Sequence, residues 1–211
     1  MRGEKMWRNR FLNGKQYDHG VFRLQVKRMS CYNKAAVCEP KITRQVRAMA
    51  KKAGMEMAGM ENRMKSRDSY LQKIQRKYGP GCQDYEVKDI LRYTYTASAE
   101  ELTKKTLKAM ELYWKSGYDT VEIKNYWLDR QSPYKGINTT LRSPDGQIFE
   151  LQYHTPESFS IKNGKMHELY EMQRPIKDLS SKEYQELWNQ MLQISNSIKQ
   201  PKDIEKVKPW E

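Results

Sequence analysis

The chain has 211 residues, which is the length of one domain or of one domain with tails. Its 39 Lys and Arg outnumber 26 Asp and Glu, and the net charge of +13 favours an anionic partner, such as nucleotide phosphates, RNA, DNA or an acidic surface, over a basic surface that is merely solvated. No segment approaches the roughly 18 apolar residues of a membrane span, and the few cysteines and histidines lack metal-ligand spacing, so we expect no membrane partner, no zinc site and no disulfide scaffold.

Three segments differ in composition. Residues 1–38 are rich in Lys and Arg and show no clear period, and we interpret them as a basic N-terminal arm or linker. Residues 39–199 carry the organised patterns and form the expected folded domain. Residues 200–211 are expected to be a frayed C-terminal tail.

The first elements are helical. Apolar residues at helical spacing predict a helix over 42–59 and a second helix over 64–78, which Gly-Pro-Gly at 79–81 should end. Residues 86–97 are rich in Tyr, Thr and aliphatic residues, which predicts a strand. A helix over 98–115 follows, and its first four residues have the pattern of a capping box.

The second half begins with strands and ends with helices. A strand is expected over 120–128, and two more over 137–142 and 147–154 surround a Ser-Pro-Asp-Gly turn, which is typical of a hairpin. Helices are expected over 165–173 and 181–197. This order predicts an α+β fold, in which helices flank a mixed β-sheet of four to five strands.

Two carboxylates stand out inside predicted strands. Asp89 lies in the strand over 86–97, on one face with Tyr93 and Tyr95, and Glu150 lies in the hairpin on one face with Gln152. If the two strands are neighbours, the carboxylates converge and could hold Mg²⁺ with a nucleoside triphosphate. The alternative is that each carboxylate pairs with a nearby Lys or Arg as a structural bridge.

A basic helix is the next candidate. Ser66, Ser69 and Lys73 fall on one stripe of the helix predicted over 64–78, and Arg63 lies near the positive end of its dipole. Such a stripe can bind phosphates, although a Lys- and Arg-rich helix is also an ordinary solvated face.

Tyr134 lies in a glycine-containing loop before a strand, where its ring could stack on a base. Lys124 and Arg130 precede it and could bind acceptor phosphates, or be ordinary surface charges.

Taken in chain order, these pieces resemble the RelA/SpoT-type synthetase domain, from about residue 42 to 174. That resemblance implies a nucleotidyltransferase-like fold and transfer of pyrophosphate from ATP to the 3′-hydroxyl of a nucleotide, usually GDP or GTP. It makes Asp89 the strand aspartate that holds Mg²⁺ and Glu150 the catalytic carboxylate, which also contacts the metal. By the same resemblance the ATP-binding residues are Arg63, Lys65, Ser66, Ser69 and Lys73.

The acceptor side resembles the family less closely. Tyr134 is similar to the tyrosine that stacks on guanine, and Lys124 belongs to a segment similar to the family's Lys-Asp-Tyr-Ile. The family's usual arginine after the aspartate is Thr94 here, its acceptor-loop histidine is Asn138, and the arginine of its last strand motif is His154. The resemblance assigns acceptor binding to Tyr134, Lys124, Arg130, Asn138, Gln152 and His154.

These departures imply that pyrophosphate donation is kept and that the acceptor has changed. Toxic members of the superfamily use adenine nucleotides or the 3′ end of tRNA, and the charge of +13 suits RNA. We therefore expect a pyrophosphokinase that acts on a nucleotide or a tRNA in the cytoplasm. We expect it to act as a toxin that is delivered from a longer protein and restrained by an antitoxin or immunity protein. The alternatives are a non-enzymatic RNA- or DNA-binding module, and a degenerate synthetase fold that serves as an interaction domain.

Overall fold

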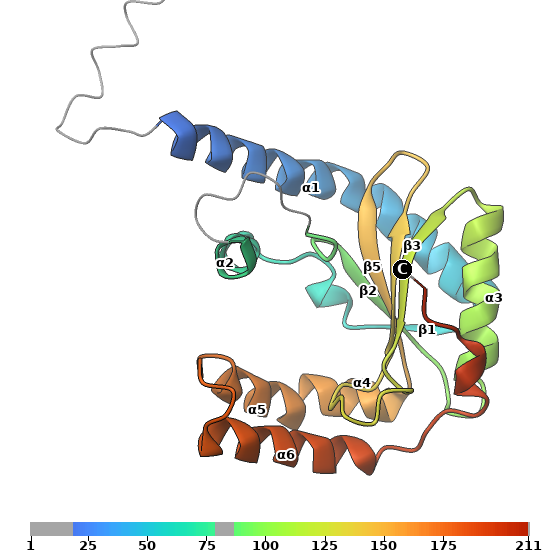
Figure 1. The fold of residues 1–211 in the computed structure, drawn as a ribbon. Coiled ribbons are helices and arrows are strands. Elements are labelled where there is room, and N and C mark those ends of the chain that lie inside the picture. Colours follow the sequence, from blue (N-terminus) through green and yellow to red (C-terminus); the bar gives the residue numbers. More distant parts are fainter. Residues whose placement is uncertain (1–18, 79–86, 211) are drawn as a thin grey trace, which may run out of the picture.

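The computed structural model describes residues 19–78 and 87–210 of the chain (Figure 1). Within these residues the strands form one five-stranded mixed sheet in the order β1-β2-β5-β4-β3. The β2–β5 pair is parallel and the other pairs are antiparallel. The expected mixed sheet with flanking helices is therefore confirmed. The strands are β1 (Glu56–Ala58), β2 (Arg92–Thr96), β3 (Asp119–Asn125), β4 (Ile137–Arg142) and β5 (Ile148–His154).

Helices cover the sheet unequally. The long helix α1 and the helix α3 pack on one face, while α2 and the run from α4 to α6 lie on the other side of the sheet from α3 (Figure 1). None of the helices in the described part of the chain is long and apolar enough to cross a bilayer. The helices are α1 (His19–Ala53), α2 (Arg67–Tyr78), α3 (Leu102–Lys115), α4 (Pro156–Asn163), α5 (Lys165–Gln173) and α6 (Lys182–Asn196), with short 3-10 turns η1 (Met60–Asn62) and η2 (Ile204–Lys206).

The two faces of the sheet have opposite chemistry, because successive side chains of a strand point to opposite faces. Tyr93 and Tyr95 of β2 and Phe149 of β5 are buried under α1 and α3. The Tyr95 hydroxyl donates to the carbonyl of Val46 in α1 and lies 2.8 Å from the hydroxyl of Tyr113 in α3. The intervening residues of the same strands are mostly polar and face away from this core.

The N-terminal helix is longer than the sequence pattern indicates. It begins at His19 rather than near residue 42, so part of the expected basic arm is helical, and residues 1–18 lie outside the described residues. Ala35 is fully buried, and the Tyr32 hydroxyl donates to the carbonyl of Lys65 at 3.0 Å. Contacts distant in sequence therefore extend this helix beyond its amphipathic stretch.

Other element boundaries also differ. The helix expected over 42–59 ends at Ala53, because Gly54 adopts a left-handed conformation and β1 follows. The helix expected from Met64 begins at Arg67, where the Ser66 hydroxyl accepts a hydrogen bond from the Ser69 backbone N–H. The glycine-proline turn expected at its end falls outside the described residues.

Asp89 does not lie within a strand. It occupies a turn, and β2 begins only at Arg92, so the face that Asp89 was expected to share with Tyr93 and Tyr95 does not exist. The expected capping box before α3 is also absent, since Glu101 caps that helix without a side-chain hydrogen bond. The helix α4 was not expected, and it begins at a capping box made by Thr155 and Ser158.

The C-terminal tail packs on the domain instead of fraying. Ile204 and Val207 are buried, and the side-chain amide of Asn125 donates to the carbonyls of both at 2.9 Å. Trp210 pairs with Ile123 at the edge of β3. The buried asparagine thereby fixes the tail to the sheet through backbone groups, a contact that composition does not reveal.

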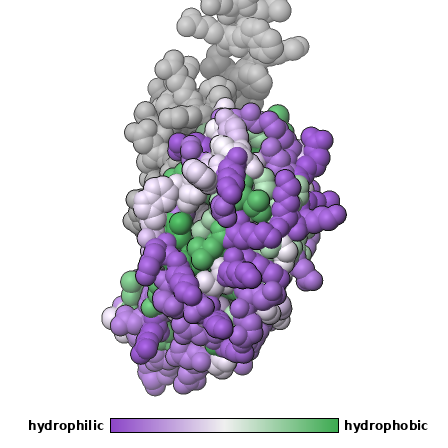
Figure 2. All heavy atoms as spheres, turned by 90° about the vertical axis from the view of Figure 1, so that its right-hand side faces the viewer, coloured by the Kyte–Doolittle hydropathy of each residue, from purple (hydrophilic) through white to green (hydrophobic). Residues whose placement is uncertain are grey.

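A groove of about 750 Å³ runs beside α3 and the β3 edge. The exposed Trp114 and Trp210 are among its lining residues. Figure 2 shows hydrophobic atoms among hydrophilic ones on the side of the molecule that carries α3. The groove is separate from the polar face of the sheet.

The buried tyrosine pair gives a test of the fold. Tyr95→Phe should lower the free energy of unfolding by about 1–3 kcal/mol, because the Val46 carbonyl and the Tyr113 hydroxyl each lose a buried partner. Urea unfolding would measure the change against Tyr170→Phe, a variant of an exposed tyrosine of α5. Equal stability of the two variants would contradict the described core.

Candidate active site

The polar face of the sheet gathers charged and amide side chains from four strands. Arg92 of β2 lies opposite Glu150 of β5, and Glu150 lies opposite Thr140 of β4. The next row contains Gln152 of β5 and Asn138 of β4, with Lys124 of β3 beyond. The alternation expected for Glu150 and Gln152 is confirmed, and the parallel β2–β5 pairing brings Glu150 toward the turn that carries Asp89.

Asp89 sits between two lysines. Its Oδ2 atom is 2.8 Å from Nζ of Lys73 and 3.4 Å from Nζ of Lys65. Burial alone would raise the pKa of Asp89, but the positive charges of Lys65 and Lys73 outweigh it and hold the pKa below its usual value. Asp89 is therefore an ionised carboxylate at the sheet edge.

Glu150 has the opposite electrostatics. Burial first, and then the negative charge of Asp89, raise the pKa of Glu150, although Arg92 opposes the shift. The Gln152 side-chain amide donates to Oε1 of Glu150 at 2.6 Å and orients the carboxylate. A carboxyl group with a raised pKa, next to one with a lowered pKa, is suited to accept a proton.

The two carboxylates also fit a divalent cation. The Oδ1 atom of Asp89 is buried without a hydrogen-bond partner, and Asp89 and Glu150 repel each other. A cation would satisfy that oxygen and relieve the repulsion. Within the described residues no group of three or more His, Cys, Asp or Glu side chains could hold a metal, so the remaining ligands would come from a bound phosphate and water.

The basic segment expected to bind phosphates lies at the start of α2. Ser66 and Ser69 are exposed there, and their hydroxyls are 2.9 Å apart. Lys65 precedes them and Lys73 follows one turn later, and both reach toward Asp89. The structure thus brings four of the five predicted ATP-binding residues to one helix start.

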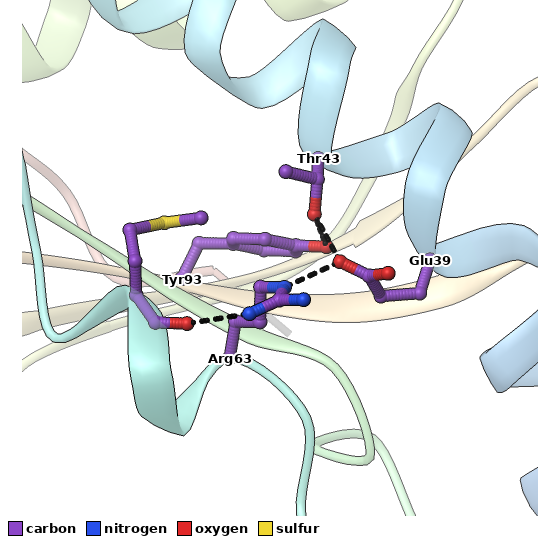
Figure 3. A network of polar contacts seen from close by, with 5 residues as sticks. Glu39, Thr43, Arg63 and Tyr93 are labelled. Carbon is purple, nitrogen blue, oxygen red and sulfur yellow. Dashed lines mark hydrogen bonds and ion pairs between the residues drawn. The ribbon is translucent and has the colours of Figure 1, made fainter.

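Arg63 lies beside this group and is bound to α1 (Figure 3). Its Nε atom donates to Glu39, and its Nη1 atom donates to the carbonyl of Met60 at 3.1 Å. The hydroxyl of Thr43 joins Glu39 to Tyr93. Because 39% of the Arg63 side chain stays exposed, it can hold the loop before α2 and still present N–H groups to a ligand.

The predicted acceptor residues Tyr134, Asn138 and His154 form one hydrogen-bonded network. The Tyr134 hydroxyl donates to Oδ1 of Asn138 at 2.6 Å and lies 2.9 Å from Nε2 of His154. Nδ1 of His154 lies 3.0 Å from the Ser158 hydroxyl, so both ring nitrogens have a hydroxyl partner. Burial, reinforced by Lys162, lowers the pKa of His154, so the ring is neutral.

This network leaves no room at Gly136. A β-carbon there would lie 2.5 Å from Cε1 of His154 and 3.0 Å from the Tyr134 hydroxyl. His154 is fully buried, so it supports Tyr134 from beneath instead of facing solvent as a phosphate-binding cation. The rings of Tyr126 and Tyr134 pack edge to face, with centroids 5.0 Å apart.

Lys124 and Arg130, the two remaining cations predicted to bind the acceptor, do not lie together. Nζ of Lys124 is 2.9 Å from Glu122 on the polar face. Arg130 is exposed and lines a separate cavity of about 370 Å³ near Trp127 and the end of α6.

Sequence reasoning missed Arg92 and Lys162. Arg92 is the positive charge that acts on Asp89, Glu150 and His154 alike. Its position opposite Glu150 depends on strand register, which sequence spacing did not reveal. Lys162 lies on the unexpected helix α4 and donates to the Gln152 amide oxygen at 2.7 Å. A helix expected from Pro156 would have been the signal for it.

Because the pKa of Glu150 is raised in the folded protein, a substitution that removes its negative charge should raise the free energy of unfolding at neutral pH. The folded protein binds the carboxyl proton of Glu150 more tightly than the unfolded chain does. Protonation of Glu150 therefore stabilises the fold below the ordinary pKa of 4.5, and this stabilisation is lost as pH rises through the pKa of the folded state. Glu150→Gln should therefore raise the urea midpoint at pH 7 in EDTA, and the gain should shrink toward pH 4.5. Glu168→Gln, on an exposed glutamate, is the control. A lower midpoint for Glu150→Gln at pH 7 would contradict the burial argument.

No protein-family model matches the sequence, and no curated protein matches it. Solved structures are similar in fold. The structure of the complex between the Type VI effector Tas1 and its immunity protein matches with a TM-score of 0.57 and 22% identity, over 80% of this chain and 94% of that chain.

Two further structures extend the comparison. The small alarmone synthetase 1 from Bacillus subtilis bound to its product pppGpp matches with a TM-score of 0.53 and 16% identity, over 82% of this chain and 92% of that chain. A GTP pyrophosphokinase family protein from Streptococcus pneumoniae matches with a TM-score of 0.51 and 17% identity, over 82% and 89%. The chain therefore has the fold of the RelA/SpoT-type small synthetases.

Proposed function

We propose that this protein is a pyrophosphokinase that transfers the β,γ-pyrophosphoryl group of ATP to the 3′-hydroxyl of a nucleotide or of a tRNA 3′ end. The observation that carries the proposal is the pair Asp89 and Glu150, one ionised and one with a raised pKa, beside the basic start of α2. The fold likeness to alarmone synthetases supports the same reaction class.

The donor triphosphate would lie along the start of α2. The exposed hydroxyls of Ser66 and Ser69 and the ammonium groups of Lys65 and Lys73 are suited to phosphate oxygens. Arg63 would add N–H donors from the edge of the site. Placement and charge neutralisation would supply most of the rate, as in phosphoryl transfer generally.

Asp89 and Glu150 are the residues that would hold Mg²⁺ together with the triphosphate. The ion would supply neutralisation of the negative charge on the phosphate oxygens. Lys65 and Lys73, which pair with Asp89 here, would be free to turn toward the same phosphates.

Glu150 would act as the general base. The acceptor 3′-hydroxyl gives its proton to the carboxylate, its oxygen bonds to the β-phosphorus, and the bond from that phosphorus to the α–β bridging oxygen breaks, so AMP leaves. The Gln152 amide holds the carboxylate for this step by its 2.6 Å hydrogen bond.

Tyr134 would stack on the acceptor base, because its hydroxyl is held by Asn138 and His154 and its ring orientation is thereby set. Lys124, Asn138 and Gln152 line the polar face where the acceptor would lie, and Arg130 would meet only an acceptor long enough to leave that face, such as tRNA. The net charge of +13 favours such an acceptor.

A toxin role in the cytoplasm, where ATP and these acceptors are found, follows from the same proposal. The fold likeness to the Type VI effector Tas1, solved with its immunity protein, supports restraint of this protein by an immunity protein. The net charge of +13 also favours the rival function of a non-enzymatic RNA- or DNA-binding module.

Product analysis distinguishes these functions. The protein would be incubated with γ-labelled ATP and Mg²⁺ and, separately, with GDP, GTP, ADP, ATP or tRNA. We expect label on one acceptor, and Glu150→Gln should reduce transfer by about 10²–10⁴-fold because the general base is lost. Salt-dependent RNA binding with no transfer to any acceptor, in a folded protein, would favour the binding module and contradict the pyrophosphokinase.

Tyr134 gives a second prediction. Tyr134→Ala should raise the KM for the acceptor about 10- to 100-fold and leave the KM for ATP unchanged, because base stacking contributes about 1–3 kcal/mol. Steady-state kinetics at varied acceptor would measure this, with Tyr134→Phe keeping the ring and Tyr170→Ala as an exposed control. An unchanged acceptor KM would remove Tyr134 from the acceptor site.

A further inference from the structure

Two cations on the polar face lack an acidic partner. Lys162 of α4 donates to the neutral amide oxygen of Gln152 at 2.7 Å and lies 5.3 Å from the centroid of the Phe159 ring. Within residues 19–78 and 87–210, neither Lys162 nor Arg92 has a carboxylate within ion-pair distance. By contrast, Lys65 and Lys73 on the α2 side share Asp89.

The two cations act on each other and on the same neighbours. Burial, and then the charge of Arg92, lower the pKa of Lys162 to about 8, while Glu150 opposes the shift. Both cations also lower the pKa of His154. The groups that face Lys162 therefore come from three elements. Arg92 comes from β2, and Phe159 comes from its own helix. The carboxyl of Glu150 and the neutral side chains of Gln152 and His154 come from β5.

This arrangement is deficient in negative charge. Arg92 lies opposite Glu150 in the sheet, and Lys162 contacts the neutral amide of Gln152 instead of a carboxylate. A half-buried ammonium with only an amide oxygen as partner is poorly compensated. An anion would make charge-assisted hydrogen bonds to both cations, and the planar guanidinium of an arginine suits a phosphate.

We propose that Arg92 and Lys162 form a phosphate-binding subsite for the acceptor, separate from the donor residues at the start of α2. This inference rests on the proposed pyrophosphokinase function. Glu150 links the two groups, since Asp89 and Lys73 act on it from the α2 side and Gln152, which Lys162 contacts, donates to it. The carboxylate thus lies between donor and acceptor phosphates, where a base for the 3′-hydroxyl is needed.

The other polar side chains of this face are already engaged. His154 and Asn138 are both hydrogen-bonded to Tyr134, so neither is free to offer charge to an anion. Lys162 and Arg92 supply positive charge to the same face from α4 and β2.

Kinetics of Lys162→Gln test the proposal. The KM for the acceptor should rise about tenfold or more, while kcat and the KM for ATP stay near wild type, and Lys162→Arg should restore part of the affinity. Lys165→Gln, on an exposed lysine at the start of α5, is the matched control. Running the series with a mononucleotide and with tRNA tells whether the bound phosphate belongs to a nucleotide or to an RNA backbone.

Two kinetic outcomes would overturn the subsite. An unchanged acceptor KM would show that Lys162 does not contact the acceptor. A loss of kcat with unchanged acceptor KM would show that Lys162 positions Glu150 through Gln152 and binds no phosphate.

A binding measurement that needs no catalysis tests the phosphate subsite independently of the proposed pyrophosphokinase activity. Lysines would be ¹³C-methylated in the Glu150→Gln protein, and the Lys162 signal identified by its absence in Lys162→Arg. Inorganic phosphate should shift that signal and raise its titration midpoint, while Lys165 stays unaffected. If no acceptor is labelled but phosphate shifts the Lys162 signal, the proposed reaction is wrong and the proposed anion site is supported. If phosphate does not shift that signal, the proposed subsite is wrong, whatever the activity.

Discussion

The parallel pairing of β2 with β5 is the constraint on which the site depends. It places Arg92 opposite Glu150 and draws the turn bearing Asp89 alongside, so a partly buried carboxyl, an ionised carboxylate and a guanidinium share one end of the sheet. Because side chains of a strand alternate, a register shift of one residue would move Glu150 into the aromatic core under α1 and α3. The core side of the sheet therefore fixes the active face: Tyr93, Tyr95, Phe149 and Tyr153 can fill the space under those helices only in this register.

Charge on the polar face is divided between two groups of cations. Lysines at the start of α2 are compensated by Asp89, while Arg92 and Lys162 are not paired with a carboxylate within the described residues. The proposed reaction joins two polyanions, which must be held against their mutual repulsion, and cations on either side of Glu150 would meet that need. The net charge of +13 favours the approach of anionic ligands.

Tyr134, His154 and the start of α4 depend on one another. A neutral, buried His154 is compatible with the Tyr134 hydroxyl above it, with Ser158 behind it and with a glycine at position 136, where any β-carbon would collide with the ring. An arginine at position 154 would carry its charge into this closed space. The loop, the strand and the start of α4 are thus one unit, and its rigid tyrosine is set by neighbours more than 15 residues away in sequence.

The sequence by itself determined the fold class, the alternation that pairs Glu150 with Gln152, and the local arrangement at the start of α2, because strand period, hairpin turns and helix caps depend on neighbours within a few residues. Of the residues it proposed for an acceptor, the structure joins Tyr134, Asn138 and His154 in one network and leaves Arg130 at a separate cavity. Only the tertiary structure decided that α1 reaches back to His19, that the tail is held by Asn125 and that Asp89 precedes its strand. It also decided that Arg92 lies opposite Glu150 and that Lys162 contacts Gln152 of the same strand. These features rest on contacts between distant segments and on strand register, and the burial that shifts the pKa of Glu150 and Lys162 exists only once those segments have packed together.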